Sequence, residues 1–358
     1  MYDNTLKDFP RLETDKSDSE RIGRAIDATP NGILCIPKGD YFLAEPILIE
    51  NRCSLDMHPA ARLIATEEMD FVITYSAKGN YHALSVFNDD GSVYDNLGIF
   101  VKGGDIDGNG LASCFAITNA HHFTMSNITF HNGKKFGLCV GGEKGGHIYE
   151  LVCNNVYCKC TMKGLTGNVG IFTDRCDSHF TDCFVVDYTV SMRLVGGSNR
   201  VTRCHVWGGT IPPEEYTLKE WSEMYAERKR KAFSGGVYTA NDVDYTKESD
   251  TPEMLKNSIS FDIQGGFNVL DGCYADTAEI GYNIGGYTRL IGCDFFNNKM
   301  MGIKKSTVIN HYGGLLDVSL CSFRSTVGTE VLYTGNKDNV RWTDNTVFGF
   351  SENIFDNK

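Results

Sequence analysis

The chain has 358 residues, of which 38 are glycine and only 8 are proline, and its net charge is −12. This acidity disfavours nucleic acid as the main partner. No apolar run reaches the ~20 residues of a membrane-spanning helix, so we expect no membrane partner. The first residues lack a basic stretch followed by an apolar one, so we expect no signal peptide and a cytoplasmic protein.

Near the amino terminus, Ser17 is followed by apolar residues at helical spacing, which predicts a helix within about residues 17–30. Gly32–Leu43 then has the pattern of a strand, a turn and a second strand. Pro46–Ile49 and Ala61–Ala65 are also expected to be strands.

A repeat of cysteine or asparagine extends over the rest of the chain. Each repeat contains one such residue, called here the marked residue, and successive marked residues are 26, 30, 21, 69, 20, 28 and 24 positions apart: Asn127, Cys153, Cys183, Cys204, Cys273, Cys293, Cys321 and Asn345. Gly-Gly pairs precede several of them, at 145–146, 196–197, 265–266, 285–286 and 313–314. Such a period is typical of a solenoid. We predict one coil of a parallel β-helix per repeat, with the marked residue inside and stacked on its counterpart in the next coil.

The 13 cysteines are expected to be reduced thiols that pack as small apolar side chains. Cys158 and Cys160 are close in sequence, but no second pair with zinc-ligand spacing accompanies them. The strands also carry no tight acidic group suited to calcium. We therefore expect no metal and no cofactor.

The helix followed by Pro37–Tyr41, and the segment Gly103–Gly110, resemble parts of the pectin-lyase-like superfamily, which includes the polygalacturonases. The resemblance implies an all-β, single-stranded, right-handed parallel β-helix that forms one domain over residues 1–358, with an amino-terminal capping helix. The polygalacturonase site is not carried over. Where that family has Asp-Asp, this chain has Asp187-Tyr188 and Asp276-Thr277, and it has no Gly-His-Gly.

The step of 69 residues is one coil plus an insertion of about residues 210–256. Residues 218–231 within it have the composition of a helix. Two interpretations remain open: a surface elaboration that covers apolar area, or one wall of a cleft.

Alternation along the strands places candidate site residues on the outside. In the strand before the Gly-Gly turn, the outward column is expected to contain Arg193, Asp262 and Tyr282, so Arg193 and Asp262 should be neighbours. In the strand after the marked residue, His205 and Asp276 should point outward. Most outward acids are only solvated, but acids one or two coils apart have the separation that glycoside cleavage needs.

We therefore predict a site beside the insertion. The catalytic carboxylates are expected among Asp262, Asp276, Asp187 and Glu279, with Asp262 and Asp276 on one face as the first choice. Substrate-binding side chains are expected among Arg193, Gln264, Tyr282, His205, Trp207 and, from the inserted helix, Trp221.

The first functional hypothesis is an enzyme that cleaves or transfers a glycosidic bond in an oligo- or polysaccharide by carboxylate acid/base catalysis. The alternatives are a uronide lyase or epimerase, a fructan transferase or hydrolase, and a non-catalytic glycan-binding or fibre β-helix. A homotrimer is a candidate assembly for proteins of this kind.

Overall fold

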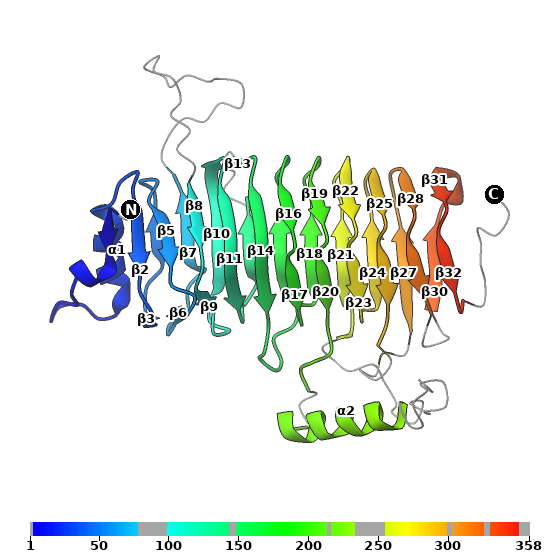
Figure 1. The fold of residues 1–358 in the computed structure, drawn as a ribbon, viewed down its shortest axis with the longest axis horizontal. Helices are drawn as coiled ribbons and strands as arrows, with labels where there is room; N and C mark the ends of the chain where they lie inside the picture. The colour runs from blue at the N-terminus through cyan, green and yellow to red at the C-terminus, as the bar shows by residue number, and fades with distance from the viewer. Residues whose placement is uncertain are drawn as a thin grey trace, which may run out of the picture.

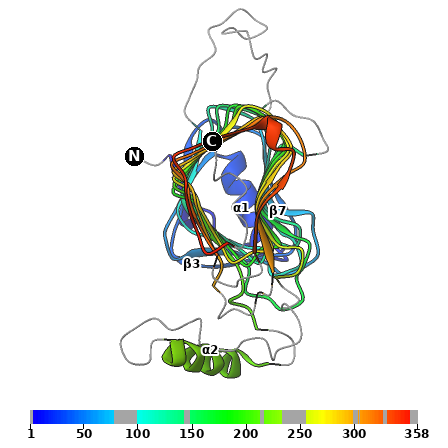
Figure 2. The ribbon, with the colours of Figure 1, turned by 90° about the vertical axis from the view of Figure 1, so that its right-hand side faces the viewer.

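The computed structural model describes residues 3–77, 99–142, 148–212, 216–232, 255–298, 303, 305–325 and 330–350. Within them the chain winds into coils of parallel strands that stack along one axis (Figure 1). Seen along that axis, the coils superimpose into one elongated ring (Figure 2). The predicted all-β, right-handed parallel β-helix is confirmed. No helix in these ranges is long and apolar enough to cross a membrane.

The strands form three faces, numbered 1 to 3, and each face takes one segment from each coil. Face 1 is a separate sheet: β4 (Ile47–Ile49), β7 (Phe71–Ser76), β10 (Ser113–His121), β12 (Phe136–Val140), β15 (Val169–Thr173), β18 (Val190–Leu194), β21 (Ile259–Ile263), β24 (Ile280–Ile284), β27 (Ser306–His311) and β30 (Glu330–Gly335). The short strand β13 (Ile148–Tyr149) pairs with β10.

Faces 2 and 3 belong to one sheet, because β11 (Thr124–His131) and β14 (Val152–Lys159) run through both. Face 2 also contains β1 (Asn4–Thr5), β2 (Ile33–Ile36), β5 (Ser54–Met57), β8 (Phe100–Lys102), β16 (His179–Thr181), β19 (Arg200–Thr202), β22 (Asn268–Asp271), β25 (Thr288–Ile291), β28 (Leu316–Ser319) and β31 (Val340–Thr343). Face 3 also contains β3 (Gly39–Leu43), β6 (Ala61–Ala65), β9 (Asp105–Asp107), β17 (Phe184–Val186), β20 (His205–Trp207), β23 (Tyr274–Asp276), β26 (Asp294–Phe296), β29 (Ser322–Arg324) and β32 (Thr346–Phe348).

Two α-helices are described. Helix α1 (Asp18–Asp27) begins at Ser17, whose side chain accepts a hydrogen bond from the backbone N–H of Ser19, and buries Ile22 and Ile26 against the first coil. Helix α2 (Leu218–Ala232) lies in the insertion and outside the ring of strands (Figure 2). Short 3₁₀ helices span Leu6–Asp8 and Lys337–Asn339.

The bend between faces 2 and 3 is made by a single left-handed residue in each of eight coils. Their φ angles lie between 51° and 61°: Asn127, Asn155, Asp182, Arg203, Gly272, Gly292, Leu320 and Asp344. Asn, Asp and Gly adopt this conformation with little strain. One residue therefore turns the chain without a loop, and strands on both sides of the bend stay in register from coil to coil.

The cysteine column follows this bend. Each column residue comes directly after the left-handed one, and the column reads Ile128, Val156, Cys183, Cys204, Cys273, Cys293, Cys321 and Asn345. The backbone N–H of Cys183 donates to Cys204 Sγ at 3.4 Å, and that of Cys321 donates to Asn345 Oδ1 at 2.8 Å. Sulfur and amide oxygen thus both accept a backbone N–H from the preceding coil, which explains why the repeat accepts either residue.

The predicted column is wrong at its first two members. Asn127 is the exposed left-handed residue itself, and Cys153 pairs in register with Phe180, in a different inward column. The reason is that Ile128 and Val156 occupy the column position in the long strands β11 and β14, so the nearest Asn or Cys is out of phase.

The Gly-Gly pairs after face 1 stack closely. A Cβ on Gly265 would lie 2.2 Å from the carbonyl oxygen of Gly196, and one on Gly286 would lie 2.2 Å from that of Gly265. Beside them the buried Asn199 and Asn268 form a ladder, in which the N–H of Asn199 donates to Asn268 Oδ1 at 3.0 Å. The pair at 145–146 lies outside the described residues.

We expect Gly265→Ala to lower the free energy of unfolding by ~2 kcal/mol or more, because the added methyl group forces two coils apart. Gly23→Ala is the matched control: nothing lies within 4 Å of its Cβ, and alanine favours the helix. Chemical denaturation measures both. Equal stability of the two variants would show that coil stacking tolerates a side chain at the glycine pairs.

Candidate functional site

The predicted neighbours Arg193 and Asp262 do meet on the outside of face 1. They are register partners on β18 and β21, and Arg193 Nε lies 2.6 Å from Asp262 Oδ2. Asp262 is only 1% exposed, and its oxygens also accept hydrogen bonds from Gln264 Nε2 at 3.0 Å and Asn283 Nδ2 at 2.8 Å. With three hydrogen bonds and almost no exposed surface, this carboxylate holds other groups in place.

Side-chain hydrogen bonds continue from Asp262 towards the carboxyl-terminal coils. Asn310 Nδ2 donates to Asn283 Oδ1, and Thr334 Oγ1 donates to Asn310 Oδ1, each at 2.7 Å. Every donor in this chain therefore points towards Asp262. At the other end, Arg193 is 31% exposed, and its Nη1 and Nη2 have no hydrogen-bond partner among the described residues. They form a fork that can bind a hydroxyl pair or a carboxylate.

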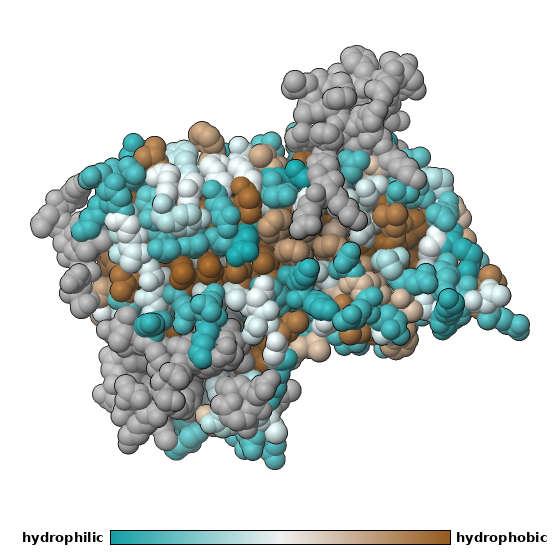
Figure 3. All heavy atoms as spheres, turned by 180° about the vertical axis from the view of Figure 1, so that it is seen from behind, coloured by the Kyte–Doolittle hydropathy of each residue, from teal (hydrophilic) through white to brown (hydrophobic). Residues whose placement is uncertain are grey.

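A groove of about 510 Å³ lies on the same face, over β7 to β15. Three phenylalanines line it: the ring centroids of Phe71 and Phe136 are 6.3 Å apart, and those of Phe136 and Phe172 are 5.3 Å apart. Figure 3 shows this side of the molecule, with an apolar band along its length. Phe172 is the register partner of Arg193, so the groove leads to the exposed guanidinium.

Polar groups stand at the borders of the groove. Asp174 follows β15, its Oδ2 accepts the N–H of Gly142 at 3.1 Å, and its Oδ1 lies 3.0 Å from Arg175 Nε. Asp70 and Lys135 are also in the lining. The groove was not predicted from the sequence, because Phe71 precedes the repeat and the repeat is out of phase at Asn127, in the coil that contains Phe136.

The prediction that Tyr282 points outward is wrong. Its ring is fully buried and stacks on Phe261 with 5.4 Å between centroids, and its hydroxyl donates to the carbonyl of Asp294 at 2.7 Å. The prediction counted back from the Gly-Gly pair, and in this coil the pair begins one residue earlier: Gly285 takes the register position of Gln264. Tyr282 therefore aligns with the inward Phe261, and Asn283 aligns with the outward Asp262.

The prediction that Asp262 and Asp276 share a face is also wrong. Asp276 lies on β23 in face 3, on the other side of the bend that leads into β24. Its Oδ2 is 3.9 Å from His205 Nε2, and it accepts a hydrogen bond from the Thr277 hydroxyl. The structure thus does not bring the first-choice carboxylates together, and a catalytic role for Asp276 stays a prediction.

His205 and Trp207 point outward on face 3, as predicted, but His205 has little free ring surface. Its ring stacks on Tyr274 at 4.5 Å and 18°, and the Trp207 ring lies 4.6 Å away. Ring faces that cover one another leave mainly edges for a ligand. These ring contacts stabilise the stacking of the coils, and they leave little flat ring face for a sugar.

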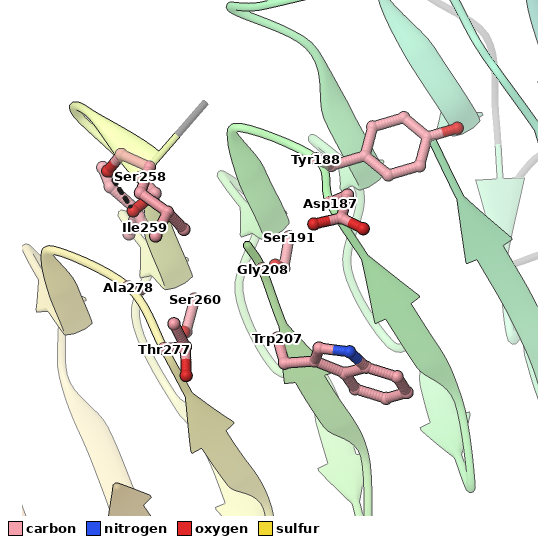
Figure 4. A pocket seen from close by; sticks show the side chains of 11 residues that line it. Asp187, Tyr188, Ser191, Trp207, Gly208, Ser258, Ile259, Ser260, Thr277 and Ala278 are labelled. Atoms are coloured by element: carbon pink, nitrogen blue, oxygen red, sulfur yellow. Dashed lines mark hydrogen bonds between the residues drawn. The ribbon is translucent and has the colours of Figure 1, made fainter. Parts of the chain in front are cut away.

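Asp187 and Glu279 hold the two ends of the insertion. Asp187, 9% exposed, accepts hydrogen bonds from the N–H of Thr210, at 2.9 Å, and from its hydroxyl. Glu279 accepts the N–H of Asn257 at 2.7 Å. Asp187 and Trp207 border a cavity of about 10 Å³ (Figure 4), which is room for about one water molecule and not for a sugar.

Trp221 lies on α2, is 7% exposed, and has its ring 5.9 Å from that of Tyr216. The Tyr216 carbonyl accepts a hydrogen bond from Lys163, which joins the insertion to the segment between β14 and β15, two coils earlier. Residues 213–215 and 233–254 lie outside the described residues. The insertion as a cleft wall and Trp221 as a binding residue therefore stay predictions.

No protein-family model and no curated protein matches the sequence. Solved structures do match. The A-module of the Azotobacter vinelandii mannuronan C-5 epimerase AlgE4 has a TM-score of 0.59 and 11% identity, and the match covers 97% of this chain and 96% of that one. The tailspike protein of E. coli bacteriophage HK620, in complex with a pentasaccharide, has a TM-score of 0.55 and 12% identity, over 96% of this chain and 64% of that one. The chain has the pectin-lyase-like fold.

Burial raises the pKa of Asp187, and hydrogen bonds from Thr210 and Gly209 oppose the shift. The folded state thus holds this proton more tightly than the unfolded chain does. The free energy of unfolding should fall as the pH rises from the unfolded pKa, ~3.9 for an aspartate, through the raised folded value. Asp187→Asn should remove this part of the pH dependence in denaturation curves.

Asp182 is the matched control, because Arg203 lowers the pKa of this carboxyl. The contribution of Asp182 to the free energy of unfolding is therefore lost as the pH falls. Asp182→Asn should therefore change the curve in the opposite direction, and only weakly, since the pair is exposed. If the free energy of unfolding of Asp187→Asn depended on pH as that of the wild type does, the raised pKa of Asp187 would be contradicted.

Proposed function

We propose that this protein is a carbohydrate-active enzyme that binds an oligo- or polysaccharide along the outside of face 1. The observation that carries this proposal is the groove of about 510 Å³ that leads to the exposed fork of Arg193. Apolar rings with a few convergent polar groups are what a ligand site requires. The epimerase and the tailspike that share the fold act on or bind glycans by their descriptions, which supports the proposal by analogy.

Cleavage or transfer of a glycosidic bond is the first reaction that we propose, with Asp174 as an acid/base residue at the groove. Asp262 then acts through Arg193, as a positioning residue. The two groove carboxylates, Asp70 and Asp174, stand three coils apart, which is ~14 Å along the axis at the usual strand spacing, and they lie at opposite ends of their strands. This exceeds the ~10 Å limit of a two-carboxylate pair, so Asp174 does not have Asp70 as its partner.

Abstraction of a proton from a uronide, by a lyase or an epimerase, is the second candidate. The observation that favours it is the pair of guanidinium groups near Asp174: Arg175 contacts it, and Arg193 is on the next coil. A guanidinium bound to the uronate carboxylate would acidify the neighbouring C–H, and a basic group would then remove the proton.

We expect Asp174→Asn to lower turnover at least ~10²-fold, the usual scale for loss of an acid or base. Arg193→Ala should mainly raise KM, ~10-fold or more, since it removes charge-assisted hydrogen bonds to the substrate. Activity is measured on a panel of neutral, amino and uronate oligosaccharides. New reducing ends without absorbance of an unsaturated uronide indicate hydrolysis, and new reducing ends with that absorbance indicate a lyase. A changed chain-length distribution without new reducing ends indicates transfer, and a changed C5 configuration at unchanged length indicates an epimerase.

Arg203→Ala is the matched control, because it breaks the exposed Arg203–Asp182 pair on another face. It should leave both constants unchanged. Wild-type turnover in Asp174→Asn would exclude this carboxylate from the chemistry. Failure of every glycan in the panel to bind would refute the proposal as a whole.

A further inference from the structure

Tyr312 has an exposed aromatic ring that rests on glycine backbone. It follows β27, is 57% exposed, and its ring reaches back over the preceding coil. A Cβ on Gly285 would lie 2.4 Å from the Tyr312 Cζ and hydroxyl oxygen, so the ring keeps this place only because residue 285 has no side chain. One side of the ring is therefore covered by the backbone of Gly285, and the other remains open.

The Tyr312 ring also lies near the Arg193–Asp262 pair. Its pKa is raised by partial burial and by the charge of Asp262, and the charge of Arg193 opposes this. Gln264 and Asn283, both bonded to Asp262, stand on the intervening coils. An open aromatic face beside amides and a guanidinium is suited to a pyranose or furanose ring, which has one apolar face and hydroxyls around its rim. His205 and Tyr274 cover each other and offer no such surface.

We propose that Tyr312 forms a second sugar subsite, so that the substrate is an extended polysaccharide lying along face 1 from the phenylalanine groove, past Arg193, to Tyr312. The inference rests on the proposed function and specifies its substrate class. From Ala116 on β10 to Gly285 after β24 there are five coil steps, ~24 Å at ~4.8 Å each, which is the length of several sugar units. A disaccharide would fill one end of this path only.

The test is the dependence of affinity on chain length. Calorimetric titration uses a series from disaccharide to octasaccharide of the neutral, amino or uronate glycan that binds in the panel above. Wild-type protein should bind the octasaccharide at least ~10-fold more tightly than the disaccharide, which corresponds to ~1.4 kcal/mol. Tyr312→Ala should lose this gain and keep the disaccharide affinity. Tyr312→Phe, which keeps the ring, should retain the gain.

Gly285→Ala provides an independent variant, because its methyl group displaces the Tyr312 ring from its place without removing it. It should reproduce the length dependence of Tyr312→Ala. Phe348→Ala is the control, since Phe348 is 71% exposed but lies at the end of face 3. It should behave as wild type.

Three results decide the matter. Loss of the length-dependent gain in both Tyr312→Ala and Gly285→Ala supports the subsite. Equal affinity for short and long chains, or a wild-type gain in Tyr312→Ala, overturns the subsite while leaving the proposed function intact. Absence of binding to every glycan overturns both. Thermal unfolding of each variant verifies that it is folded.

Discussion

The parallel hydrogen bonds between coils depend on a bend that repeats in eight successive coils. One left-handed residue makes that bend from Asn127 to Asp344, and the next residue points inward. Arg203 and Leu320 adopt this conformation although neither residue type favours it, which shows that stacking overrides local preference. The inward thiols of Cys204 and Cys321, and the amide of Asn345, follow from the bend, because a backbone N–H on the preceding coil needs an acceptor at that point.

The sequence predicts those parts of the structure that the repeat controls. Arg193 and Asp262 are 69 positions apart, yet their contact follows from alternation and from the Gly-Gly pairs that end both strands. The prediction fails where the Gly-Gly pair is shifted by one residue along the coil. Gly285 takes the register position of Gln264, so Tyr282 aligns with Phe261 in the core and Asn283 aligns with Asp262 outside. The spacing of the glycine pairs along the sequence does not show that shift.

The candidate site shows a second limit of sequence reasoning. Asp262 and Asp276 are close in the chain, and both point outward, but a bend places them on different faces. Asp187 and Glu279 were expected to be catalytic, and the structure shows that they hold the ends of the insertion. The groove beside Arg193 depends on the side chains of several strands together, with Phe71 and Phe136 at one register position and Phe172 at another. A shape of that kind becomes apparent only when the coils are assembled.

The position of the insertion has a consequence for the order of folding. Arg193 and Asp262 belong to coils that are adjacent in space but separated along the chain by the whole inserted segment. Closing so long a loop costs conformational entropy before the coil contacts repay it. The binding face is therefore completed only when the two halves of the solenoid have docked, and a chain that stalls at this point has two half-solenoids without the Arg193–Asp262 pair.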